Sequence, residues 1–402
     1  MQQNTSIKTI LRLIGTWVMM IFVIGSVSAW FLHQLQSVTD TRLKHNWLIY
    51  FLPIAGFIIT WIYQTLGSEL EAGNNLVIQR ITGKKKNNLP FLIAPLIYVS
   101  TLLSHLFGAS VGREGTAIQY SAGIADWFQK KFSIPRKYHR ILLQSAVAAG
   151  FASVFATPLT GILFAIEWTP RKFKWKQLPI VIASAFGAYA CAQIWNPPHT
   201  HYIHTHDIDW SWSLIGGLLL AALLFGLVAR LFSSSISLLK KGLQKILPSA
   251  PLRTFVGGLA IVALYLIIQD NRYLGLGIPT IQDAFVSNAM IYVFALKFLF
   301  TVISISSGFK GGEVTPLFFI GATLGSTLAF LLPIETALLA AMGFVAVFAG
   351  ATNTPFACAI MASELFGWET LIISLPVCYL SFLVSGKTSI YSEQIPLLRK
   401  LF

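Results

Sequence analysis

The sequence has few charged residues, and few acidic ones in particular. Only 11% of its 402 residues are charged, with 15 acidic against 29 basic side chains, whereas a soluble domain carries about 25% charged residues. Hydrophobic residues make up 55% of the chain, and a soluble fold could not hide so much apolar surface. The composition therefore predicts a protein whose solvent is a lipid bilayer.

Cysteine is also scarce. Cys191, Cys358 and Cys378 lie in or beside apolar segments and have neither metal-site spacing nor an obvious pairing. Buried packing is the usual role of such residues, so we expect neither disulfides nor redox chemistry. The apolar segments also lack a nucleophile–base pair and a metal-ligating triad. We therefore expect a protein that is not an enzyme and that needs no cofactor.

Long apolar runs recur along the chain. A spanning helix needs about 20 mostly apolar residues, and clear examples are residues 10–32, 48–66, 214–231, 289–305 and 338–361. The first run is too long for the core of a signal peptide and has no clean cleavage site, so we interpret it as a retained helix. We predict an all-α polytopic membrane protein, with residues 1–402 forming one integral-membrane domain and no soluble C-terminal domain.

Basic residues cluster in short segments between the apolar runs, namely residues 84–86, 130–140, 171–176 and 240–245. Under the positive-inside rule these segments face the cytoplasm, and we expect a multi-pass protein of the plasma (inner) membrane. A nucleic-acid-binding surface would gather its basic residues on one face. Hydrophobic spans separate them here, so no nucleic-acid partner is expected, and the positive charge could instead draw anions toward a pore.

Three apolar regions are interrupted by Gly, Pro and polar residues, at 72–76, 107–116 and 306–316. Irregular backbone at membrane depth survives only where it is buried in protein or lines a water-filled cavity. Paired breaks in the two halves of a transporter often mark a site where the N-termini of half-helices point at an anion. The breaks therefore favour an inverted repeat built around an anion site.

The second break carries an Arg-Glu pair between glycines, in the run Gly112-Arg113-Glu114-Gly115-Thr116. The glycines leave backbone N–H groups free to face a ligand, and a helix is predicted over residues 117–127, so the segment reads as an anion-binding helix N-terminus. A deprotonated Glu114 would compete with the anion, and a protonated or displaced Glu114 would admit it. The alternative is that Glu114 only caps the helix with Arg113 as its partner. An ionisable residue at membrane depth favours the functional role.

Four segments, in order, resemble motifs of the CLC family of chloride channels and proton-coupled exchangers: residues 112–116, 155–167, 306–316 and 386–392. The resemblance implies a homodimeric CLC fold with an inverted repeat, broken and re-entrant helices, and a pore in each subunit. It implies that Glu114 is the gate and proton carrier and that the Tyr391 hydroxyl reaches the central anion. The other residues expected around the anion are Arg113, Gly115, Thr116, Val314 and Thr315.

Two departures from the chloride motifs resemble the fluoride-exporting branch of the family. Asn74 and Asn75 stand where chloride transporters supply a serine, and Glu313 stands where they have an apolar residue. We favour Asn75 as the residue that faces the pore and keep Asn74 as the alternative. Fluoride is a small, strong hydrogen-bond acceptor, so amide and hydroxyl donors suit it. We predict a fluoride/proton antiporter that exports fluoride, with a chloride/proton exchanger or chloride channel as the alternative.

Two further carboxylates bear on the proton route. A second carboxylate beside an anion path is useful only if it is protonated for part of the cycle, so we expect Glu313 to couple protons to fluoride rather than to lie on the surface. Trp168 stands at the position of the family's inner proton glutamate. Either the neighbouring Glu167 substitutes for that glutamate, or protons take an inner route through Glu313. We favour the route through Glu313 and expect Glu167 to pack with Arg171 or Lys172.

A histidine-rich segment, residues 198–207, lies in the longest polar interlude, residues 195–209. Its pairs His199/His201 and His204/His206 could bind zinc or copper, which would suit a membrane metal-binding or sensor protein. Nothing in the sequence places these histidines near the anion path. We therefore expect a solvated loop and no metal site.

Overall fold

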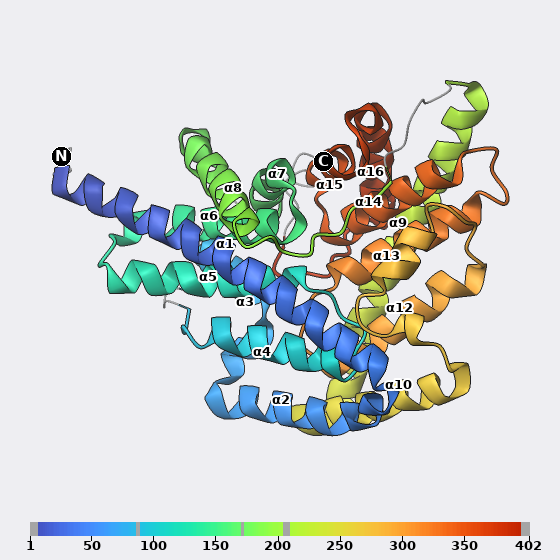
Figure 1. Ribbon diagram of the computed structural model, residues 1–402, viewed down its shortest axis with the longest axis horizontal. Helices are drawn as coiled ribbons and strands as arrows, with labels where there is room; N and C mark the ends of the chain where they lie inside the picture. The colour runs from blue at the N-terminus through green and yellow to red at the C-terminus, as the bar shows by residue number, and fades with distance from the viewer. Residues whose placement is uncertain (1–6, 86–88, 170–172, 204–209, 395–402) are drawn as a thin grey trace.

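The computed structural model describes residues 7–85, 89–169, 173–203 and 210–394, and over these ranges it is helical without a named strand. Figure 1 shows the helices packed into one body and crossing at many different angles. Within the described ranges, five helices are long and apolar enough to cross a membrane, at Leu11–Lys44, Asn46–Leu66, Trp212–Ile246, Ala250–Ile268 and Trp368–Ser385. The prediction of an all-α polytopic membrane protein is confirmed.

The first half of the chain contains α1 (Ile7–Lys44), α2 (Leu52–Leu66), α3 (Asn74–Thr82), α4 (Ile93–Leu106), α5 (Glu114–Lys131), α6 (His139–Phe155), α7 (Pro158–Glu167) and α8 (Leu178–Gln193). The second half contains α9 (Trp212–Ile246), α10 (Ala250–Ile268), α11 (Ile278–Asp283), α12 (Ile291–Ser307), α13 (Val314–Leu328), α14 (Thr336–Thr352), α15 (Pro355–Phe366) and α16 (Leu371–Ser385). Short 3-10 turns lie at Asn46–Phe51, Ser68–Ala72, Arg136–Tyr138, Trp175–Gln177, Asn271–Tyr273 and Trp368–Thr370.

The second half repeats the order of the first. A long helix opens each half, α1 and α9, and a short helix stands third in each, α3 and α11. The loop before α5 meets the loop before α13 through an antiparallel bridge, in which Gly112 and Gly312 exchange N–H···O bonds. Antiparallel pairing relates its two segments by a local two-fold axis. The two halves are therefore inverted relative to each other, as the paired breaks predicted.

One predicted span is wrong and two are too short. The run 338–361 is not one helix, because α14 ends at Thr352 and α15 begins at Pro355. Asn353 between them adopts the left-handed conformation with φ 56°, and Pro355 has no N–H with which to continue the ladder of α14. The predicted spans 10–32 and 214–231 both lie within longer helices, α1 and α9, because polar residues beyond each apolar run continue the helix.

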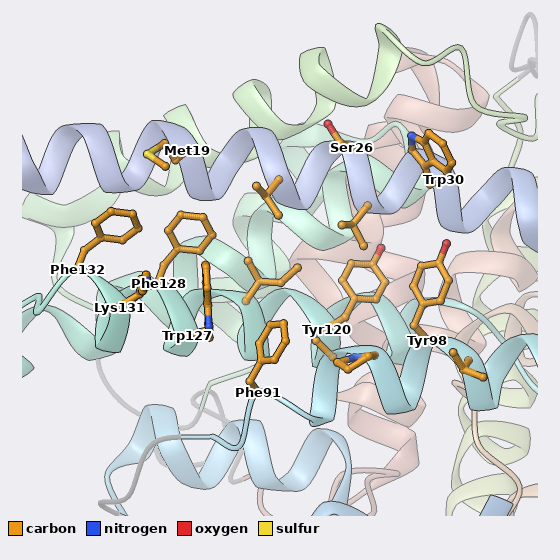
Figure 2. A pocket seen from close by; sticks show the side chains of 16 residues that line it. Met19, Ser26, Trp30, Phe91, Tyr98, Tyr120, Trp127, Phe128, Lys131 and Phe132 are labelled. Carbon is orange, nitrogen blue, oxygen red and sulfur yellow. The ribbon is translucent and has the colours of Figure 1, made fainter.

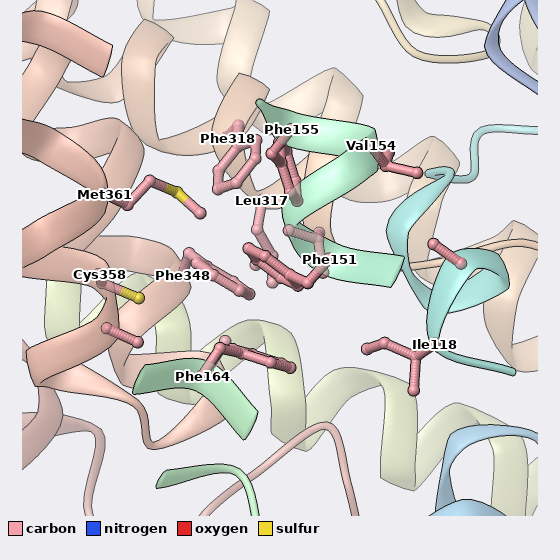
Figure 3. Close-up of a cluster of buried hydrophobic side chains, with 14 of the residues drawn as sticks. Ile118, Phe151, Val154, Phe155, Phe164, Leu317, Phe318, Phe348, Cys358 and Met361 are labelled. Atoms are coloured by element: carbon pink, nitrogen blue, oxygen red, sulfur yellow. The ribbon is translucent and has the colours of Figure 1, made fainter. Parts of the chain in front are cut away.

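Aromatic side chains from both halves form a buried cluster at the centre of the molecule, shown in Figure 3. Phe155 from α6 meets Phe318 from α13 with ring centroids 5.5 Å apart. Phe318 meets Phe348 from α14 at 5.2 Å, and Phe348 stacks on Phe164 from α7 at 6.1 Å. Because the two outer rings come from the first half and the two rings between them from the second, this cluster holds the two repeats together beside the broken helices.

Candidate functional site

The N-termini of α5 and α13 meet at the two glycine loops. A Cβ on Gly112 would lie 2.8 Å from Glu114 Oε2, and a Cβ on Gly312 would lie 2.6 Å from the backbone nitrogen of Gly115. Neither position can hold a larger residue without moving the backbone or the carboxylate. Glycine therefore lets two helix N-termini approach closely, which concentrates free N–H groups and positive dipole ends at one point.

The carboxylate of Glu114 fills this point. Glu114 is only 1% exposed, and its Oε2 accepts hydrogen bonds from Arg113 N and Thr315 N, each at 3.1 Å. The Thr315 hydroxyl donates to Oε1, and Arg113 Nε lies 3.5 Å from the same oxygen. Glu114 thus takes up backbone donors of both half-helices, the same donors that a bound anion would need.

A cavity of about 520 Å³ lies on one side of Glu114. We call it the lysine cavity, because the basic residues among its lining are Lys240, Lys241, Lys310 and Arg253. Asn74, Glu313 and Tyr391 also line it. It therefore combines a positive wall with the polar side chains that the sequence analysis assigned to the anion.

Those three side chains each carry a buried polar atom without a hydrogen-bond partner among the described residues. The atoms are Asn74 Oδ1, Glu313 Oε2 and Tyr391 Oη. Buried polar groups in proteins are nearly always paired, and an unpaired group costs about 1–3 kcal/mol. The Tyr391 hydroxyl can donate to an anion, and Glu313 can do so when it is protonated, whereas Asn74 Oδ1 is an acceptor and Asn74 could face an anion only through its Nδ2 group. The unpaired Tyr391 hydroxyl and Glu313 carboxyl therefore mark this cavity as a candidate ligand site.

The two asparagines point in different directions, since neighbouring residues on a helix are about 100° apart. The side-chain Nδ2 of Asn74 lies 2.8 Å from where a Cβ of Gly115 would stand, next to the first turn of α5. The Oδ1 of Asn75 instead accepts a hydrogen bond from Glu393 N at 3.1 Å. Both asparagines line the lysine cavity, but the Asn74 side chain lies nearer the start of α5, and the expectation that Asn75 faces the pore stays a prediction.

A second cavity, of about 610 Å³, lies on the other side of Glu114. We call it the histidine cavity, because His199 and His201 line it together with Arg42 and Arg113. Arg113 thus opens to the histidine cavity while Gly311 and Glu313 open to the lysine cavity. Glu114 follows Arg113 in the chain and accepts a hydrogen bond from Thr315, two residues after Glu313, so it lies between residues that line the two cavities.

The other residues predicted around the anion differ in what their side chains contact. Thr315 contributes both its N–H and its hydroxyl to the Glu114 carboxylate. Val314 is the first residue of α13 and its side chain is fully buried, so only its backbone is available at the site. The hydroxyl of Thr116 pairs with Thr101 on α4 at 2.6 Å. That bond turns Thr116 toward α4 and away from Glu114.

Tyr391 is positioned by a residue to which the sequence analysis gave no such role. Trp168 meets the Tyr391 ring edge-on with centroids 5.6 Å apart, and it stacks on Phe164 at 5.8 Å. Trp168 therefore joins the central aromatic cluster to the hydroxyl at the anion site. The only sign of this role in the sequence was that Trp168 directly follows Glu167, the last residue of the motif at 155–167.

Glu167 and Glu364 form a reciprocal pair of helix caps, which the sequence analysis missed. Glu167, at the end of α7, accepts hydrogen bonds from Phe356 N and Ala357 N at the start of α15, at 3.2 and 2.7 Å. Glu364 on α15 accepts from Leu159 N and Thr160 N at the start of α7, at 2.9 and 2.8 Å. The expected partners of Glu167, residues 171 and 172, lie outside the described residues.

The signal for this pair was present in the sequence. Each glutamate follows a Thr-Pro pair at the same spacing, Thr157-Pro158 before Glu167 and Thr354-Pro355 before Glu364. A carboxylate at a helix N-terminus is favoured by the helix dipole. The repeated spacing therefore marks equivalent caps in the two halves.

The histidine-rich loop is not a simple solvated loop over its described part. Tyr202 packs against Phe344 and Phe366, with ring centroids 5.2 and 5.8 Å away. His199 bonds through Nε2 to the carbonyl oxygen of Ser153 at 2.9 Å, and partial burial lowers the pKa of its imidazole. Residues 198–201 of the loop line the histidine cavity, whereas His204, His206 and Asp207 lie outside the described residues. Among the side chains that are described, no group of three or more could hold a metal ion.

Comparison with known proteins places the chain in a family. The family model of the voltage gated chloride channel matches residues 55–386. A chloride/fluoride channel protein of Pseudomonas syringae pv. tomato is 43% identical over 378 residues, covering 92% of this chain and 83% of the relative. A voltage-gated ClC-type chloride channel of Salmonella typhimurium, ClcB, is 27% identical over 311 residues, covering 73% of this chain and 74% of that protein.

Solved structures agree on the fold. A CLC-type fluoride/proton antiporter superposes with a TM-score of 0.92 at 34% identity, covering 97% of this chain and 99% of that one. A slow cyanobacterial Cl⁻/H⁺ antiporter superposes with a TM-score of 0.83 at 19% identity, covering 97% and 98%, and at that identity it supports the fold alone. Since the family model covers most of the chain and a 43%-identical relative covers nearly all of it, the chain belongs to the voltage-gated chloride channel family, the CLC family that its motifs resemble.

Proposed function

We propose that this protein is a fluoride/proton antiporter that exports fluoride from the cytoplasm and so protects the cell from it. The observation that carries the proposal is that the unpaired Tyr391 hydroxyl and Glu313 carboxyl line the lysine cavity together with the Asn74 amide. The similarity to a fluoride/proton antiporter and to a chloride/fluoride channel protein supports it. The activity is transport without a covalent step, so no cofactor is required.

The side chains at the site suit fluoride because they can replace a tightly held water shell. The Asn74 amide and the Tyr391 hydroxyl are hydrogen-bond donors, and Glu313 is a donor when it is protonated. Hydrogen bonds to an anion are shorter and stronger than bonds between neutral groups. A short carboxylic acid donor that can also release its proton would bind fluoride and couple it to protons in one group.

Glu114 supplies the second proton site and the gate. Protonation removes the charge that holds its carboxylate on Arg113 N and Thr315 N, because a neutral carboxyl is the weaker acceptor. The carboxyl can then leave and an anion can take its place between the half-helices. When the anion leaves, the deprotonated carboxylate returns and closes the path between the two cavities.

Charge indicates which side of the membrane each cavity faces. Lys240 and Lys241 belong to a basic segment that the positive-inside rule assigns to the cytoplasm, and both line the lysine cavity. The lysine cavity would therefore open to the cytoplasm and the histidine cavity to the outside. Location in the plasma membrane and assembly as a homodimer with one pore in each subunit belong to the same proposal.

The second candidate is chloride transport, as an exchanger or a channel. The similarity to a protein named for both chloride and fluoride favours keeping it, and the cationic wall of the lysine cavity would attract either anion. The membrane metal-sensor hypothesis makes a different prediction. Replacing His199 and His201 with alanine would abolish a sensor but leave anion movement by a transporter in place.

Flux from proteoliposomes tests the proposal directly. Purified protein is reconstituted in vesicles loaded with both anions, and fluoride, chloride and proton movements are followed together with electrodes and a pH dye. We expect fluoride efflux accompanied by proton influx, with chloride efflux much slower. Equal rates for the two anions would favour the chloride alternative, and fluoride efflux without proton movement would rule out antiport.

A further inference from the structure

A third cavity lies apart from the anion path, in a groove between α1, α4 and α5. Figure 2 shows the groove running along α1 from Met19 to Trp30, with Phe91 and Tyr98 on the opposite side. Its volume is about 790 Å³, and its described lining is almost entirely apolar and aromatic. Trp30, Phe91 and Trp127 remain exposed to the surroundings at the rim. Exposed apolar side chains gathered in this way mark a surface that contacts protein or membrane, and Trp is enriched where a membrane meets water.

The few polar groups at the base of the groove are already paired. The Tyr120 hydroxyl bonds to Ser28 Oγ at 2.7 Å, and Ser153 Oγ donates to the same Ser28 oxygen at 2.8 Å. A polar ligand would therefore find little to bind inside. The groove suits an apolar chain, for which burial against apolar side chains is favourable and needs no directional partner.

The length of the groove fits one leaflet of a bilayer. The eleven helical steps from Met19 to Trp30 rise along α1 by about 16 Å at 1.5 Å per residue. The hydrocarbon core of a bilayer is about 30 Å thick, so the groove is about as long as one leaflet is deep. An acyl chain lying along α1 would fill it from end to end.

A single cation stands at one end. Lys131 is the charged residue among the described lining residues, and it lies at that end beside Phe132 and Met19 (Figure 2). Lys131 is exposed, and among the described residues no ion pair joins it to an acidic side chain. Asp126, one turn away, is buried and bonded to His139 at 2.6 Å. The ammonium group of Lys131 is therefore free for an anionic headgroup.

We propose that this groove binds an anionic glycerophospholipid, with one acyl chain between α1, α4 and α5 and its phosphate at Lys131. The proposal needs the chain to lie in a membrane but does not depend on which anion it transports. It also gives the lipid a place in the mechanism, because α5 begins at Glu114. A bound acyl chain would support the helix that carries the gate.

Lipid binding to the delipidated full-length protein tests this. Native mass spectrometry would count bound lipids during titration with phosphatidylglycerol and with phosphatidylcholine of identical acyl chains. We expect one phosphatidylglycerol to bind per subunit about fivefold more tightly than phosphatidylcholine, since a lysine near an anionic lipid contributes about that factor. Equal affinity for the two lipids would overturn the proposal.

Three variants locate the site. Lys131→Gln should lower phosphatidylglycerol affinity about fivefold and leave phosphatidylcholine affinity unchanged. Lys130→Gln removes the same charge from an exposed neighbour that does not line the groove, so it should change neither affinity. Val27→Trp fills the groove from α1 and should weaken both lipids. An equal loss in Lys130→Gln, or lipid affinities unchanged by Val27→Trp in a variant that still transports anions, would contradict the proposal.

Discussion

The two loops that meet at the anion site are equivalent in backbone but not in side chains. Because Gly112 pairs with Gly312, Arg113 corresponds to Glu313, and Glu114 corresponds to Val314. Glu114 therefore has no acidic counterpart, and its carboxylate crosses the two-fold axis to reach Thr315. The equivalent loop before α13 carries its acidic residue one position earlier than the α5 loop does. That residue, Glu313, is the N-cap of α13 and makes no side-chain capping bond there.

A second pair of glutamates behaves in the opposite way. Glu167 and Glu364 occupy equivalent positions, and each accepts backbone hydrogen bonds from the N-terminus of the other half's helix. Where the two halves carry the same residue at equivalent places, the result is a symmetric brace. Where they differ, at Glu114 and Glu313, one carboxylate is fully bonded and the other has a buried oxygen without a described partner. Function therefore follows the asymmetry of the side chains, while the symmetric positions provide the frame.

The largest effect is expected at Glu114. Glu114→Gln keeps the size of the side chain and removes both its charge and its ability to carry a proton. We expect fluoride-driven proton movement in proteoliposomes to fall to the background of empty vesicles, with fluoride transport either blocked or uncoupled. Proton pumping at the wild-type rate in this variant would show that Glu114 is not the proton carrier.

The next effect concerns Glu313. Glu313→Gln keeps a hydrogen-bond donor without a proton to release, and Glu313→Ala removes both. We expect both variants to lose coupled exchange, and Ala to bind fluoride about tenfold more weakly than Gln, the value of one hydrogen bond to a charged group of about 1.5 kcal/mol. Isothermal titration with fluoride measures the difference. If Glu313→Ala kept full proton coupling, the inner proton role would pass to Glu167 or to water.

A smaller effect should separate the two asparagines. Asn74→Ser shortens the side chain next to Gly115 and should lower the fluoride-to-chloride flux ratio about tenfold, through the loss of one well-placed donor. Asn75→Ser is the comparison variant and should change the ratio less than about twofold, because the Asn75 side chain, although it also lines the lysine cavity, accepts a hydrogen bond from the backbone of Glu393. The reverse order of effects would return the pore-facing role to Asn75.

The smallest effect is expected at the symmetric brace. Glu167→Gln and Glu364→Gln should each destabilise the protein by about 1–2 kcal/mol, through weaker bonds to a helix N-terminus, and both should retain proton coupling. Glu335→Gln is the control, because Glu335 stands at the N-cap of α14 without a side-chain capping bond. Thermal unfolding in detergent measures stability. Loss of coupling in Glu167→Gln alone would make Glu167 part of the proton route.

Several features of this protein could be read from the sequence because they depend on local chemistry. Apolar composition is enough to predict a membrane protein, and glycine-rich breaks are enough to predict where the helices stop. The Arg-Glu pair between glycines marks the start of α5 as a candidate gate, since few residue types suit an anion-binding N-terminus. The acidic residue at position 313 stands out for the same reason, because a carboxylate in an apolar segment needs a function.

Other features depended on contacts between residues far apart in the chain, and only the tertiary structure decided them. A local pattern could not tell Asn74 from Asn75, since the choice depends on how α3 is rotated against Gly115 and the segment after α16. It could not find that Glu167 caps α15, because that helix lies in the other half of the molecule. The apolar run 338–361 was predicted as one span, whereas Asn353 and Pro355 divide it into two helices that pack separately. In each case hydrophobicity fixes which residues are buried, but packing between the inverted halves fixes which neighbours they meet.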